Sequence, residues 1–163
     1  MTMLLSVFNK TVLSAAMAFL PHNMDSTQAR VMLVAIGLQE SELCYHIQCH
    51  GPAKGLWQFE QVGVQGVFDD SRTHDLAVAV CLAMGVDANA AAVYARLPQD
   101  DVLAAVFARL TLWIDMQPLP ALGDVNGAWQ CYLRNWRPGK PRVSDWPLNY
   151  SKALAAVTGD ANA

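Results

Sequence analysis

Apolar residues recur at helical spacing along most of the chain, which predicts a mainly helical protein. Residues 1–20 predict an amphipathic helix that packs on the rest of the domain. Its apolar positions are Leu5, Phe8, Val12, Ala15 and Phe19. Polar side chains interrupt this segment too often for a transmembrane helix, which needs about 20 predominantly apolar residues. We also expect no signal peptide, because its one cation, Lys10, lies in the middle rather than at the start.

The next segment predicts a helix that is apolar on every face. Asp25 is followed three positions later by Gln28, an arrangement typical of a capping box at a helix start. The run from Val31 to Leu38 then contains no polar side chain. We therefore expect this helix to lie buried in the middle of the domain and to end at Glu40.

The rest of the chain predicts further helices around one small irregular lobe. Four glycines interrupt residues 51–66, which favours turns or a short hairpin beside a cleft. The expected helices are residues 75–84, 88–97, 98–117, 124–136 and 149–157. With 163 residues and no repeat or linker, the chain predicts a single domain over residues 1–163.

Composition and charge exclude several classes of protein. Hydrophobic residues make up 53% of the chain and charged residues 15%, which excludes intrinsic disorder and a coiled coil. The net charge of −3 gives no general basis for binding nucleic acid, and no nucleic-acid motif is present. Residues 134–142 nevertheless hold four cations. This patch suits peptidoglycan carboxylates or a phosphate backbone, and the alternative is a solvated basic loop.

The four cysteines are expected to be reduced and buried or half-buried in a chain made in the cytosol. Cys44, His46, Cys49 and His50 are all residue types that bind zinc. All four come from one short loop, however, whereas structural zinc sites take close pairs from separate elements. We therefore expect neither a metal nor another cofactor. A strained disulfide between Cys44 and Cys49 stays open as an alternative.

The candidate chemistry centres on the end of the apolar helix. The chain has only three glutamates, and two of them, Glu40 and Glu42, lie at this end. The negative end of the helix dipole and a neighbouring apolar wall both raise a carboxyl pKa. A raised carboxyl pKa is what a general acid needs near neutral pH. We interpret Glu42 as a solvated neighbour, because two positions along a helix it points away from Glu40.

Two segments together resemble the lysozyme-like superfamily, specifically its lytic transglycosylase branch. Residues 35–41, Ala-Ile-Gly-Leu-Gln-Glu-Ser, resemble the helix of that branch that ends in a Glu-Ser pair. Residues 55–59, Gly-Leu-Trp-Gln-Phe, resemble its Gly-Leu-x-Gln segment, which lines the saccharide cleft. Residues 101–105 and 132–141 resemble small proteins encoded by phages and prophages. The resemblance implies an α+β lysozyme-like domain.

The resemblance also implies roles for individual residues. Glu40 would be the general acid and later the base, and Ser41 would orient its carboxyl group. The family's Ala-Tyr-Asn segment, whose tyrosine reaches the catalytic glutamate, is not plainly present; Tyr132 is our substitute and Tyr94 the second choice. Trp129 shares a helix face with Tyr132 and is either a sugar platform or part of the core. The residues implied to line the cleft are Gly55, Leu56, Trp57, Gln58 and Phe59.

The implied function is that of a phage lysin which cleaves the MurNAc–GlcNAc bond of peptidoglycan. With Glu40 alone, the muramic 6-hydroxyl attacks and the enzyme is a transglycosylase; a second carboxyl group, from Glu60, Asp69 or Asp70, would allow lysozyme-type hydrolysis. Its partner would be the glycan strand, and it would reside in the virion or the host cytoplasm. The alternative is a non-catalytic tail or capsid protein that contacts other virion proteins. A weaker alternative is a carbohydrate-binding module.

Overall fold

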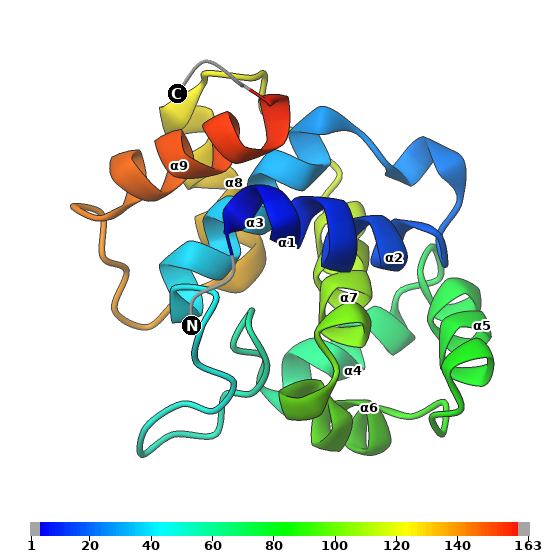
Figure 1. Ribbon diagram of the computed structural model, residues 1–163. Coiled ribbons are helices and arrows are strands. Elements are labelled where there is room, and N and C mark those ends of the chain that lie inside the picture. The colour runs from blue at the N-terminus through cyan, green and yellow to red at the C-terminus, as the bar shows by residue number, and fades with distance from the viewer. Residues whose placement is uncertain (1–3, 160–163) are drawn as a thin grey trace.

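The computed structural model describes residues 4–159, which form a mainly helical structure and confirm the expected class (Figure 1). The backbone of these residues forms no strand, only two isolated antiparallel bridges, Ile47 with Lys54 and Lys54 with Phe59. The elements are α1 (Leu5–Phe8), η1 (Asn9–Leu13), α2 (Ser14–Met17), η2 (His22–Met24), α3 (Thr27–Ser41), α4 (Gln61–Asp69), α5 (His74–Met84), α6 (Ala90–Arg96), η3 (Leu97–Gln99), α7 (Asp101–Ile114), α8 (Val125–Trp136) and α9 (Trp146–Thr158).

The N-terminal segment is one helix over residues 5–17 that widens into a π-helical stretch at Asn9–Leu13. Its apolar side contacts α9 at the start and α7 at the end. Figure 1 shows it in blue, crossing the front of the molecule. Residues 1–3 of the predicted amphipathic helix lie outside the described part of the chain. Its buried residues include Phe8, Leu13, Ala16 and Met17.

The N-cap of α3 lies one residue later than the Asp25 that we predicted from the sequence. Ser26 is the N-cap, and its Oγ accepts a hydrogen bond from the backbone N–H of Ala29 at 3.1 Å. Asp25 is instead paired with Arg30, whose Nε lies 2.7 Å from Oδ1. From there on, residues 31–39 are all buried, and α3 contacts α9, α7, α8 and η1. An ion pair with Arg30, five residues along the chain, therefore engages the side chain that the sequence pattern assigned to capping.

The end of α3 is a sharp turn built without glycine. Glu42 and Leu43 both have left-handed φ values, 57° and 50°. The backbone N–H of Glu42 donates to the carbonyl of Leu38 at 3.1 Å, the single bond of an αL cap, and the N–H of Leu43 reaches back to the carbonyl of Gly37 at 3.2 Å. A Cβ at Gly37 would lie 2.3 Å from Leu43 Cδ2, so this glycine makes room for Leu43 to fold over the helix.

The lobe that follows α3 begins and ends earlier in the chain than predicted. Turns and the two bridges occupy residues 42–60, shown in cyan at the lower left of Figure 1. Residues 61–66, expected to continue the turns, instead begin α4 despite Gly63 and Gly66. Val64, Val67 and Phe68 are buried along one side of α4, so tertiary packing outweighs the low helix propensity of glycine there.

The remaining helices enclose the core close to the expected positions. α7 is buried over most of its length, with Leu103, Phe107 and Leu110 fully enclosed, and α9 runs beside α3. The helices expected at 75–84, 124–136 and 149–157 are α5, α8 and α9, with boundaries that differ by no more than three residues. Among residues 4–159, no helix combines the length and apolarity that crossing a bilayer requires.

We predict that Ser26→Ala lowers the free energy of unfolding by about 1 kcal/mol, because it removes the side-chain acceptor at the start of α3. Chemical denaturation measures this directly. Ser151→Ala is the matched control, since Ser151 is exposed within α9 and should leave stability unchanged or slightly raised. Equal losses in both variants would show that Ser26 does not cap α3.

Candidate active site

Glu40 lies in the last turn of α3, where the helix leaves the core. The nine residues before it are buried, whereas its own side chain is partly exposed. Its Oε1 accepts a hydrogen bond from the hydroxyl of Tyr132 at 2.6 Å. Tyr132 comes from α8, is 2% exposed, and stacks on Trp146 with ring centroids 5.2 Å apart. The carboxyl group is thus held by a hydroxyl that the core keeps in place.

The surroundings of Glu40 favour its protonated form. Burial raises the pKa of Glu40, and the Tyr132 hydrogen bond and the nearby positive charge of Arg142 oppose this rise only in part. The pKa of Tyr132 is also raised, first by burial and then by the negative charge of Glu40. Tyr132 therefore keeps its proton and remains a donor. Glu40 combines the raised pKa and the access to solvent that a general acid needs.

Arg142 reaches this end of α3 through a hydrogen-bonded clamp that sequence reasoning missed. The side-chain amide of Gln39 donates to the carbonyl of Arg142 at 2.9 Å and accepts from Asn149 Nδ2 at 2.9 Å. The Arg142 guanidinium in turn donates to the carbonyl of Gln39. The clamp fixes the loop between α8 and α9 beside Glu40. The only signal of this clamp in the sequence was Gln39, a glutamine at the end of an apolar run.

Ser41 does not orient the Glu40 carboxyl group, contrary to expectation. Its side chain is buried, and its hydroxyl lies 2.6 Å from the carbonyl of Leu56 and 3.2 Å from that of Gly37. Since a hydroxyl has one proton to donate, the shorter contact ties α3 to the lobe. Ser41 therefore positions the segment beside Glu40 instead of touching the carboxylate.

Most of the segment 55–59 belongs to the core, which corrects its expected role as a cleft wall. The side chains of Leu56, Trp57 and Phe59 are at most 5% exposed. Trp57 donates from Nε1 to the carbonyl of Leu33 in α3 at 2.9 Å, and Phe59 packs on Trp136 with centroids 5.9 Å apart. The lobe is too small to have a core of its own, so its large apolar side chains anchor it to the main core.

Gln58 and Gly55 form the turn between these anchors. Gln58 is half-buried and donates from Nε2 to the carbonyls of Gly55 at 2.8 Å and Tyr45 at 3.2 Å. Gly55 has a φ of 73°, and a Cβ there would lie 3.1 Å from Leu97 Cβ. The Gln58 amide, which we expected to contact sugar, is thus hydrogen-bonded to backbone carbonyls. Gly55 allows the turn to lie close to Leu97.

The other two aromatic candidates, Tyr94 and Trp129, lie in different parts of the structure. The Tyr94 hydroxyl binds the carbonyl of Pro52, and Lys54 Nζ lies 4.2 Å from its ring centroid, so Tyr94 supports the lobe. Trp129 is half-buried and packs on Tyr132 with centroids 5.2 Å apart. Of the two tyrosines proposed to reach Glu40, Tyr132 is the one that does.

The cysteine- and histidine-containing loop shows no metal-binding arrangement. No three His, Cys, Asp or Glu side chains of residues 4–159 come together in a way that could hold a metal ion. His46 is engaged with Asp101, with Nε2 2.9 Å from Oδ1. Cys44 and Cys49 are exposed free thiols, so the expectation that all four cysteines are buried or half-buried is wrong for these two.

Similarity to known proteins does not assign this site. Comparison with protein-family models, curated proteins and solved structures gave no match. The site is defined by its own geometry, a partly exposed carboxyl group of raised pKa held by a buried tyrosine beside an arginine. Such a group can give a proton to a leaving oxygen and take one back.

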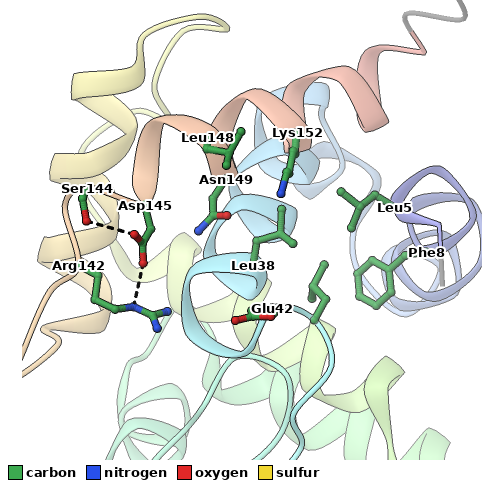
Figure 2. Close-up of a pocket in the computed structure, with 11 residues that line it drawn as sticks. Leu5, Phe8, Leu38, Glu42, Arg142, Ser144, Asp145, Leu148, Asn149 and Lys152 are labelled. Atoms are coloured by element: carbon green, nitrogen blue, oxygen red, sulfur yellow. Dashed lines mark hydrogen bonds and ion pairs between the residues drawn. The ribbon is translucent and has the colours of Figure 1, made fainter. Parts of the chain in front are cut away.

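A cavity of about 650 Å³ lies between α1, α9 and the end of α3 (Figure 2). Its wall includes Glu42, the next glutamate along the chain, and Arg142 from the clamped loop. Glu42 is exposed, as expected for a solvated neighbour of Glu40. Arg142 thus lines the cavity and also acts on the charge of Glu40.

We predict that Glu40→Gln stabilises the protein at high pH but not at low pH. The pKa of Glu40 is higher in the folded than in the unfolded chain, so the folded state binds more protons between these two values and loses stability as pH rises through them. The difference in free energy of unfolding between Glu40→Gln and wild type should be small below the ordinary glutamate pKa of about 4.3. Above that pH, the free energy of unfolding of the variant should increasingly exceed that of wild type.

Chemical denaturation across pH measures this difference. Glu60→Gln is the control, since it makes the same chemical change at an exposed residue at the start of α4. A difference for Glu40→Gln that stays constant across pH would contradict the raised pKa.

Proposed function

We propose that this chain cleaves the MurNAc–GlcNAc bond of peptidoglycan, with Glu40 as general acid and then general base. The observation that carries the proposal is the 2.6 Å hydrogen bond from Tyr132 to Glu40, a carboxyl group whose pKa is raised by burial. In the lytic transglycosylase branch that the sequence resembles, a tyrosine reaches the catalytic glutamate. Tyr132 supplies this contact from α8, although the usual Ala-Tyr-Asn context is absent.

In this mechanism, protonated Glu40 donates its proton to the glycosidic oxygen as the bond from C1 of MurNAc to that oxygen breaks. The resulting Glu40 carboxylate then accepts a proton from the attacking hydroxyl group. Tyr132 and Arg142 stabilise this carboxylate, since both interactions lower the pKa of Glu40. Their contribution increases as negative charge develops on Glu40, which is the condition for lowering the barrier.

The proposed attacking group is the muramic 6-hydroxyl, which makes the enzyme a transglycosylase. Hydrolysis generally uses a second carboxyl group across the scissile bond. Asp69 accepts from Gln65 at 2.8 Å, and Asp70 is paired with Arg72 at 2.8 Å, so neighbouring side chains engage both. Glu60 is exposed at the start of α4. These contacts favour a site that works through Glu40 alone.

The proposal includes the setting that the sequence resemblance implies, a phage lysin that acts on the wall from the virion or from the host cytoplasm. A purely structural tail or capsid protein would have no need for a partly exposed carboxyl group of raised pKa. This argues for an enzyme. The non-catalytic virion protein is the alternative that the test below would support if no products form.

The test is digestion of purified peptidoglycan by wild type, Glu40→Gln and Glu60→Gln, with mass spectrometry of the released muropeptides. We expect anhydro-muropeptides from wild type and Glu60→Gln. Glu40→Gln keeps the side-chain volume but removes the transferable proton, so its rate should fall at least about 100-fold.

Other products give other conclusions. Reducing ends in place of anhydro ends would mean that water attacks, and a loss of activity in Glu60→Gln would identify the second carboxyl group. The absence of products from folded wild type would contradict the proposal and favour the structural virion protein.

A further inference from the structure

The peptide group that joins Gln39 to Glu40 is hydrogen-bonded to an arginine. The guanidinium of Arg142 donates to the carbonyl of Gln39, the residue directly before Glu40. The positive charge of Arg142 therefore lies at the last turn of α3, where it favours the charged form of Glu40. Arg142 itself is exposed in the loop between α8 and α9. Because fixing such a long side chain costs conformational entropy, other contacts are needed to hold it in place.

Gln39 and Asn149 supply these contacts. Gln39 is 3% exposed, and its side-chain amide donates to the carbonyl of Arg142 and accepts from Asn149 Nδ2, both at 2.9 Å. The carbonyl of Arg142 can only accept, so Gln39 must present Nε2 to it and Oε1 to Asn149. Asn149 thus contributes the donor that this arrangement requires. Figure 2 shows its side chain between α9 and α3, on the same side of the molecule as Arg142.

Asp145 competes with this clamp for the same arginine. Its Oδ2 lies 3.4 Å from Arg142 Nε, and both side chains are about half exposed (Figure 2). An arginine released from the clamp would be drawn toward this carboxylate and toward solvent, which screens its charge. Asp145 also offsets part of the positive charge that Arg142 presents to Glu40. The clamp and Asp145 therefore act on Glu40 in opposite directions.

We propose that Asn149 is a positioning residue of the candidate site: through Gln39 it holds Arg142 where the arginine stabilises the Glu40 carboxylate. The inference rests on the proposed function, because a carboxylate is what Glu40 becomes once it has given up its proton. It adds that α9, which carries none of the site residues expected from the sequence, helps to set the protonation of Glu40 without touching the substrate.

The first test is a titration that needs no turnover. The chain has three glutamates, so carbon-13 labelling of glutamate carboxyl groups gives three signals, and the signal lost in Glu40→Gln belongs to Glu40. Asn149→Ala should raise the pKa of Glu40, because Arg142 is no longer held beside it. Asp145→Asn should lower this pKa, because the opposing charge is removed. Asp145 makes no side-chain capping bond to α9, so this variant keeps the start of the helix intact.

The other groups around Glu40 are the same in these variants. Tyr132 from α8 still donates to Glu40, and Glu42 is still exposed after the end of α3. Asp87→Asn is the control for Asp145→Asn, since it makes the same change in net charge at an exposed residue between α5 and α6. No shift in Asn149→Ala, or equal shifts in the two aspartate variants, would overturn the proposal.

A double-mutant cycle separates positioning from a merely structural role. Arg142→Gln removes the charge that Asn149 is proposed to hold. Asn149→Ala should therefore raise the pKa of Glu40 in the wild-type background and leave it unchanged in the Arg142→Gln background. Equal shifts in both backgrounds would mean that Asn149 acts through the packing of α9, which would overturn the proposal.

The second test follows turnover of peptidoglycan across pH. Asn149→Ala should lower kcat by at most about fivefold, the upper end for one exposed charge interaction, and leave KM unchanged. The pH at which kcat/KM falls should move upward together with the pKa of Glu40. If that pKa moves and the pH profile does not, or if wild type releases no products, the proposed function fails. The carbon-13 titration still decides separately whether Asn149 positions Arg142.

Discussion

A carboxyl group at the edge of an apolar core is the constraint on which the site depends. Burial disfavours the charged form of Glu40. A 2.6 Å hydrogen bond from the hydroxyl of Tyr132 offsets part of this effect. The balance leaves the pKa of Glu40 above its ordinary value. Tyr132 holds this position because Trp146 and Trp129 pack on its ring.

The same end of α3 also fixes the elements around Glu40. Ser41 binds the lobe through Leu56, and Gln39 binds the loop between α8 and α9 through Arg142. Three consecutive residues thus have different tasks: Gln39 clamps the loop, Glu40 is the proposed general acid, and Ser41 anchors the lobe. The left-handed turn at Glu42 then ends α3, and Glu40 just before it is partly exposed.

Local patterns in the sequence were enough to predict the helical class, most helices, and the position of Glu40 at the end of α3. The contact between Tyr132 and Glu40 was proposed from a resemblance and from the shared face of α8. What the sequence could not provide were partners far away in the chain. Trp57 was assigned to the cleft because its neighbours resemble a cleft segment, whereas its indole binds the carbonyl of Leu33, 24 positions earlier.

The most direct test of this account is the protonation of Glu40 during turnover. Carbon-13 NMR of the Glu40 carboxyl carbon gives its pKa, and kcat/KM on peptidoglycan across pH gives the pKa of the group that must be protonated. The account predicts that the two values coincide above the ordinary glutamate range, and that activity falls as pH rises through them. A Glu40 pKa in the ordinary range, or activity that does not change across its titration, would contradict general acid catalysis by Glu40.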